Sequence, residues 1–159
     1  MNKKTISIQG VEIKELVEHQ DERGFFCEII RASDPFFQNR FAQLSHSMSQ
    51  EGVFKAWHIH QKQTDWMYAS NGDIKLALFD TREDSDTKGQ LMEIYTGEHY
   101  GRKVVRIPPG VAHGYKIIRG PAYVIYMMDR EYDPADEGRI PHDDPKIGYD
   151  WLAPGKDSK

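Results

Sequence analysis

The chain has 159 residues, a hydrophobic content of 38% and a formal net charge of −4 at pH 7. This composition predicts a single globular domain over residues 1–159, and the lack of a basic tract argues against nucleic acid as a partner. Cys27 is the single cysteine, so no intrachain disulfide can form. The N-terminus lacks a secretory apolar stretch, and the longest apolar run, residues 122–128, is far shorter than the ~20 residues that cross a bilayer. We therefore expect a cytoplasmic protein with no membrane partner.

The elements expected along the chain are mostly β-strands. One helical turn is predicted within residues 33–41, where Ser33 or Asp34 can cap and Pro35 suits the first helical position. Apolar alternation then predicts strands at residues 53–60, 73–79, 103–107 and 122–128. In the second of these, Ile74, Leu76 and Leu78 share one face. In the first, the shared face is expected to hold Phe54, Ala56, His58 and His60. Turn signals separate the strands at residues 71–72, 96–97, 108–110 and 120–121. Short strands at this spacing are typical of an antiparallel sandwich or barrel.

The C-terminal segment differs from the rest. Residues 129–159 are rich in prolines and acidic residues, which predicts an ordered, turn-rich extension rather than strands, added to a core of about residues 20–128. Five apolar residues are candidates to pin this extension to the body: Tyr132, Ile140, Ile147, Tyr149 and Trp151.

Two stretches carry residues that are candidates for a catalytic or metal-binding role. His58 and His60 lie two positions apart, so a strand projects both imidazoles to one side. His113 follows the turn of residues 108–110, a loop position of the kind where functional residues tend to lie. The pattern His-x-His-x4-Asp-x6-Gly, completed by Pro-x-Gly-x2-His, resembles the two motifs of the cupin superfamily. In metal-binding cupins the positions of His58, His60, Asp65 and His113 are the ligands, and these residue types suit Fe, Mn, Zn or Ni.

The wider sequence is similar to one branch of that superfamily. The stretches at residues 21–29, 41–61, 72–90, 107–115, 124–140 and 143–151 follow one another as in the dTDP-4-dehydrorhamnose 3,5-epimerase family. The resemblance covers nearly the whole chain. It implies an all-β, cupin-type double-stranded β-helix (jelly roll), a homodimer, and catalysis without metal or other cofactor. The implied substrate is a nucleotide-linked 4-keto-6-deoxy sugar, with dTDP as the expected nucleotide.

The resemblance also implies roles for single residues. His58 matches the family's catalytic base, Tyr126 matches its acid, and Asp157 matches the carboxylate that orients the base. Histidine and tyrosine suit these tasks, because one accepts a proton near neutral pH and the other offers a hydroxyl proton. The positions that match substrate-binding residues are Arg23, Glu28, Gln43, Lys55, His113 and Glu137.

Besides Lys55, which stands where the family has an arginine, two positions depart from the family pattern. Asp65 stands where the family has a lysine near the developing enolate oxygen, and a carboxylate there would repel an oxyanion. His60 stands where the family has a glutamine. The same two residues complete the metal-ligand set, so a metal-dependent cupin enzyme using His58, His60, Asp65 and His113 is the first alternative. A non-catalytic nucleotide-sugar binding module is the second.

Overall fold

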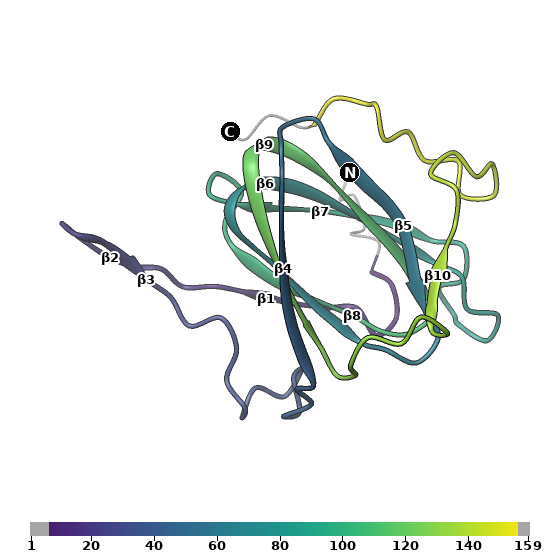
Figure 1. Cartoon of the computed structure of the whole chain (residues 1–159), viewed down its shortest axis with the longest axis horizontal. Helices are drawn as coiled ribbons and strands as arrows, with labels where there is room; N and C mark the ends of the chain where they lie inside the picture. The colour runs from purple at the N-terminus through teal and green to yellow at the C-terminus, as the bar shows by residue number, and fades with distance from the viewer. Residues whose placement is uncertain (1–6, 156–159) are drawn as a thin grey trace, which may run out of the picture.

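The computed structural model describes residues 7–155, and within them it has ten β-strands and no helix (Figure 1). The strands are β1 (Glu12–Glu15), β2 (His19–Asp21), β3 (Gly24–Phe26), β4 (Gln43–Ser49), β5 (Phe54–His60), β6 (Asp65–Asp80), β7 (Leu91–Gly97), β8 (Lys103–Ile107), β9 (Val111–Met128) and β10 (Glu137–Arg139). This part of the chain therefore contains no helix that could cross a bilayer.

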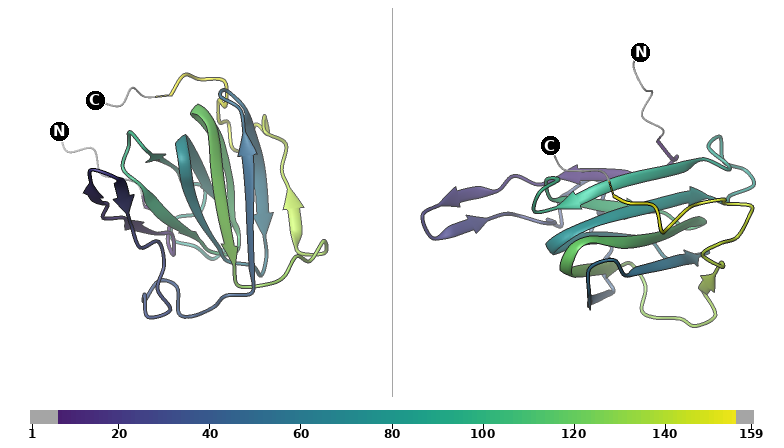
Figure 2. Two further views of the ribbon diagram at one scale, coloured as in Figure 1. Left: turned by 60° about the vertical axis from the view of Figure 1, so that its left-hand side comes forward. Right: turned by 90° about the horizontal axis from the view of Figure 1, so that it is seen from above.

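Two long strands organise the fold. β6 and β9 pair antiparallel along most of their length, and the main sheet runs in the order β1-β8-β6-β9-β5-β10. β4 pairs with the second half of β9, and β7 pairs with the second half of β6. The long strands thus take different neighbours at their two ends and curve around a common interior (Figure 2). This confirms the predicted all-β jelly roll.

The prediction of chain-reversing turns at residues 71–72 and 120–121 is wrong, because both dipeptides lie inside the long strands. The β6–β9 register shifts between Ala69 and Ile74, and Gly72 adopts a φ of 73° there. A side chain at Gly72 would meet the carbonyl oxygen of Arg119 at 2.6 Å, so the position requires glycine. Such irregularities bend a strand without ending it. The signals at residues 96–97 and 108–110 do end strands, as predicted.

The main core fills the interior between the curved layers. Ile74, Leu76 and Leu78 of β6 are all buried in it, which confirms the predicted face of that strand. The predicted face of β5 is wrong. Its pairing with β9 shifts register between Lys55 and His58, so that Phe54 and Ala56 pack outside the site with Trp57. Lys55 instead shares the pocket side with His58 and His60.

The C-terminal extension covers the back of β5 and the adjoining strands. Ile140, Ile147, Tyr149 and Trp151 join the cluster around Trp57, which confirms four of the five predicted contacts. Tyr132 is 63% exposed and does not pin the segment. The extension also contributes a strand that was not predicted, because β10 pairs with β5 at the edge of the sheet.

Residues 33–41 were expected to contain a helical turn, but they form non-helical turns only. The carbonyl oxygen of Asp34 accepts hydrogen bonds from the N–H groups of Phe37 and Gln38, as a first helical turn would. Gln38 and Asn39 then adopt positive φ angles of 56° and 50°, which breaks the right-handed path. The segment covers the outer face of the sheet, where Phe36 and Phe37 join Trp66 and Tyr68.

A hairpin of β2 and β3 stands away from the body (Figures 1 and 2). It exposes Phe25 and Phe26 as well as the nearby Val17. A two-stranded hairpin is at best marginally stable alone in water.

Candidate active site

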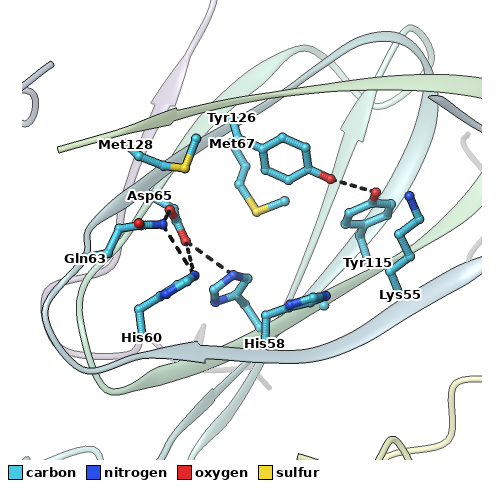
Figure 3. A pocket seen from close by; sticks show the side chains of 11 residues that line it. Lys55, His58, His60, Gln63, Asp65, Met67, Tyr115, Tyr126 and Met128 are labelled. Carbon is cyan, nitrogen blue, oxygen red and sulfur yellow. Dashed lines mark hydrogen bonds and ion pairs between the residues drawn. The ribbon is translucent and has the colours of Figure 1, made fainter. Parts of the chain in front are cut away.

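A pocket of about 260 Å³ opens into the jelly roll between β5, β6 and β9 (Figure 3). Eleven residues line it: Lys55, His58, His60, Gln63, Asp65, Met67, His113, Gly114, Tyr115, Tyr126 and Met128. All three strands contribute residues to this interior, so polar groups far apart in sequence converge there. Six of the residues predicted for catalysis, binding or metal coordination lie within it: Lys55, His58, His60, Asp65, His113 and Tyr126.

His58 faces the carboxylate of Glu137, a residue that the resemblance matches to substrate binding. Its Nδ1 atom lies 3.6 Å from Oε1 of Glu137, at ion-pair range rather than within a short hydrogen bond. A proton on Nδ1 is favoured by this neighbour, which makes Nε2 the basic nitrogen. Partial burial lowers the pKa of His58, and neighbouring His113 and Arg139 lower it further. The imidazole is therefore neutral and able to accept a proton at neutral pH.

Glu137 is itself held in place. The Tyr132 hydroxyl donates to its Oε2 at 3.1 Å, and Arg139 donates to its Oε1 at 3.1 Å. Burial raises the pKa of Glu137, but these two hydrogen bonds and the nearby charges outweigh it and keep the pKa below its usual value. Glu137 is thus a carboxylate beside His58. Asp157, which the resemblance matches to the carboxylate that orients the base, lies outside the described residues.

Tyr126 belongs to a closed ring of three hydroxyl groups. Its oxygen lies 2.7 Å from that of Tyr115 and 2.9 Å from that of Ser47, and the last two are 3.0 Å apart. Burial raises the pKa of Tyr126, and Tyr115 raises it further, so the hydroxyl keeps its proton at neutral pH. In such a ring each hydroxyl can donate one hydrogen bond and accept another.

A second polar cluster lies at the other end of the pocket. Asp65 Oδ2 is 3.4 Å from Nε2 of His113 and 3.8 Å from Nε2 of His60, while Gln63 donates to Asp65 Oδ1 at 2.7 Å. Burial lowers the pKa of His113, against the opposing effect of Asp65. Of the four ligands in the predicted metal set, His60, Asp65 and His113 offer atoms within 4.8 Å of one another. His58 lies outside that group.

The remaining predicted binding residues are scattered. Lys55 lines the pocket, with its amine 6.0 Å from the centre of the Tyr115 ring. Gln43 lies on β4, and its Oε1 accepts a hydrogen bond from the backbone of Tyr132. Arg23, at the tip of the projecting hairpin, pairs with its neighbour Asp21 and has an 82% exposed side chain.

Glu28 follows that hairpin and pairs with Arg31. Neither Arg23 nor Glu28 is among the residues that line this chain's own pocket. Ser47 and Tyr115 were not predicted as site residues. The signal for Tyr115 was its place two residues after His113, where a strand repeats the same face.

Comparison with known proteins gives a consistent result. The sequence model described as dTDP-4-dehydrorhamnose 3,5-epimerase matches residues 5–159. The spore coat polysaccharide biosynthesis protein SpsL of Bacillus subtilis is 43% identical over 147 residues, which cover 91% of this chain and 96% of that protein. A dTDP sugar isomerase structure from Desulfovibrio desulfuricans G20 is similar at a TM-score of 0.86 and 29% identity, with 95% of each chain covered. The structure of dTDP-6-deoxy-D-glucose-3,5-epimerase from Legionella pneumophila, which contains dTDP-4-keto-L-rhamnose, matches at a TM-score of 0.82 and 29% identity, covering 92% of this chain and 81% of that one.

Proposed function

The chain belongs to the dTDP-4-dehydrorhamnose 3,5-epimerase family, and we propose that it epimerises a dTDP-linked 4-keto-6-deoxy sugar at C3, C5 or both. The product would serve deoxysugar and polysaccharide biosynthesis, in keeping with the name of the spore coat polysaccharide biosynthesis protein of Bacillus subtilis. We place this reaction in the cytoplasm. The observation that carries the proposal is that His58 and Tyr126 line one pocket, where burial lowers the pKa of the histidine and raises the pKa of the tyrosine.

The proposed reaction is a two-residue proton transfer. The C4 ketone acidifies the protons on C3 and C5, so Nε2 of His58 removes one of them and leaves an enolate. Tyr126 returns a proton to the opposite face of the same carbon, and its own proton is restored through Ser47 and Tyr115 or from water. Glu137 stabilises the imidazolium formed on His58 and keeps its Nδ1 protonated. Lys55 binds phosphate at the mouth of the pocket, and Gln43 and His113 complete the binding surface.

We further propose that the enzyme is a homodimer. The projecting hairpin carries Arg23 and exposed Phe25 and Phe26 beyond the body of its own chain. A second copy would cover these apolar side chains, and Arg23 and Glu28 would then contact substrate in the partner's pocket. Sedimentation or light scattering of the purified chain tests this assembly directly.

Solvent-deuterium exchange tests the chemistry. The protein is incubated with dTDP-4-keto-6-deoxyglucose in heavy water, and the C3 and C5 protons and the product configuration are followed by NMR. We expect wild type to exchange and invert at least one centre. Tyr126→Phe should still exchange through His58 but invert about 10²–10⁴-fold more slowly, whereas His58→Ala should do neither.

The matched control is His46→Ala, which removes an exposed histidine from the outer side of β4. It should behave like wild type. Absence of exchange at both carbons with wild type would refute the epimerase function and leave a nucleotide-sugar binding module. Exchange by His58→Ala at the wild-type rate would refute His58 as the base.

A further inference from the structure

Arg139 and His58 approach the same carboxylate oxygen from two neighbouring strands. Nη2 of Arg139 donates to Oε1 of Glu137 at 3.1 Å, and Nδ1 of His58 lies 3.6 Å from that oxygen. We propose that Arg139 is a specificity-determining residue: the diphosphate of a nucleotide-linked substrate draws its guanidinium away from Glu137, and Oε1 of Glu137 then closes onto Nδ1 of His58. This role rests on the proposed function, because it is assigned for that substrate.

The edge strand β10 places Arg139 beside the base (Figure 1). Arg139 is paired with His58 in the register of β10 and β5. Glu137 lies two positions earlier, so the strand projects its side chain to the same side as that of Arg139. Gly138 between them lets the two strands approach closely, since a side chain there would meet Cγ2 of Ile59 at 2.7 Å. The sequence Glu-Gly-Arg therefore fixes a carboxylate and a guanidinium next to the imidazole.

The carboxylate of Glu137 is held short of contact with His58. Their separation of 3.6 Å is longer than the ~2.7–3.2 Å of an N–H···O hydrogen bond. Tyr132 donates to Oε2 at 3.1 Å, and Arg139 donates to Oε1. Both oxygens of the carboxylate thus already accept a hydrogen bond from another residue. Release of Arg139 leaves the Tyr132 hydroxyl as a fixed point about which Oε1 can turn toward His58.

The contact between Arg139 and Glu137 is one that a stronger anion can break. The Arg139 side chain is 73% exposed, and that of Glu137 is 21% exposed. Water and salt weaken an ion pair with so exposed a member. A diphosphate carries more negative charge than one carboxylate and presents paired oxygens that a guanidinium binds through two nitrogens at once. It therefore competes successfully with Glu137 for Arg139.

The diphosphate of a bound substrate lies within reach of Arg139. Lys55 lies three positions before His58 on β5 and lines the same pocket. One cation therefore precedes the base along β5, and the other stands across from it on β10. In a pyranose ring, C1 is only two bonds from C3 and two bonds from C5. When either carbon presents its proton to His58, the phosphate attached to C1 is close to the base and to both cations.

The released carboxylate supports the base during the reaction. A hydrogen bond from Nδ1 of His58 to Oε1 of Glu137 becomes charge-assisted once His58 has taken the substrate proton. It stabilises the imidazolium formed in that step, so it lowers the barrier rather than only tightening binding. The nucleotide end of the substrate, which does not react, thereby accelerates the chemistry at the sugar ring. A 4-keto-6-deoxy sugar without its diphosphate leaves Arg139 on Glu137 and should exchange its protons more slowly.

The first test needs no turnover. The full-length protein, isotope-labelled at histidine nitrogen, is titrated with dTDP, and the Nδ1–H resonance of His58 is followed by proton NMR and identified by its loss in His58→Gln. We expect this resonance to move downfield in wild type as dTDP saturates the site, because the hydrogen bond to Glu137 forms. In Arg139→Gln the resonance should lie downfield already without dTDP and should not move when dTDP binds.

Calorimetry and exchange kinetics give the second readout. Arg139→Gln should bind dTDP about tenfold more weakly than wild type, and Arg139→Lys, which keeps the charge without the planar fork, should lie between them. In the deuterium-exchange assay, Arg139→Gln should raise KM for the dTDP-linked sugar and leave kcat near the wild-type value. The same variant should exchange the free 4-keto-6-deoxy sugar faster than wild type does. Thermal unfolding shows whether each variant is folded.

The matched control is Arg130→Gln. Arg130 is an exposed arginine of the same C-terminal extension, and its Nε donates to the carbonyl oxygen of Lys62 at 3.3 Å. The control should behave like wild type in every assay. The inference is overturned by any of three results: wild-type affinity of Arg139→Gln for dTDP, an unmoved His58 resonance in wild type saturated with dTDP, or a lower kcat with unchanged KM in Arg139→Gln. The dTDP titrations contain no keto sugar, so they can succeed where the epimerase test fails, and fail where it succeeds.

Discussion

Trp151 anchors the C-terminal extension on the back of the strands that carry the site. Its side chain is only 2% exposed, and its ring centre lies 4.8 Å from that of Trp57 and 4.7 Å from that of Tyr149. A side chain built on Gly114 would meet the Trp151 ring at 2.9 Å, so the indole lies directly against β9 beside His113. Removing this ring should loosen the extension and open a cavity behind the pocket.

We expect Trp151→Ala to lower the free energy of unfolding by about 3–5 kcal/mol, the usual cost of truncating a buried tryptophan. For a chain of this size, that corresponds to a fall in Tm of roughly 6–20 °C. Urea unfolding followed by circular dichroism measures it. Leu152→Ala is the control, because Leu152 is 79% exposed and should change stability by less than about 0.5 kcal/mol. Equal stability of the two variants would refute the anchoring role.

Three further changes separate stability from chemistry. Burial raises the pKa of Asp80, but hydrogen bonds led by Arg82 hold it well below the usual value. Asp80→Asn should therefore lower the free energy of unfolding by about 2–3 kcal/mol at pH 7. The difference in stability between this variant and wild type should shrink as the pH falls below about 4, where the carboxylate of the unfolded chain gains its proton. A difference in stability that does not depend on pH would contradict this. Ser47→Ala removes one neutral hydrogen bond from Tyr126, so kcat should fall roughly fivefold with KM unchanged, and an unaltered kcat would count against the hydroxyl ring. Lys55→Gln should raise KM about tenfold and weaken its dependence on salt if Lys55 binds phosphate, whereas a change confined to kcat would argue for a different role.

The sequence predicted the strands better than it predicted their irregularities. Alternation identified the buried face of residues 73–79, because that part of β6 is regular. It failed for residues 53–60, where the register shift after Lys55 exchanges the two faces. A single extra residue inverts every later assignment in a strand, and nothing in apolar alternation marks where it enters. The projection of His58 and His60 to one side was still correct, since both follow the irregularity.

The carboxylate behind His58 shows a second limit of linear sequence. Glu137 was matched to substrate binding, and its place beside the base depends on β10 pairing with β5, in a segment whose composition predicted turns. In that register Glu137 pairs with His60 and Arg139 with His58, so both charged groups near the base come from the extension. Trp151 holds the same extension against β9. The stability of the extension and the basicity of His58 are therefore linked. Trp151→Ala should lower kcat even at temperatures where the jelly roll stays folded.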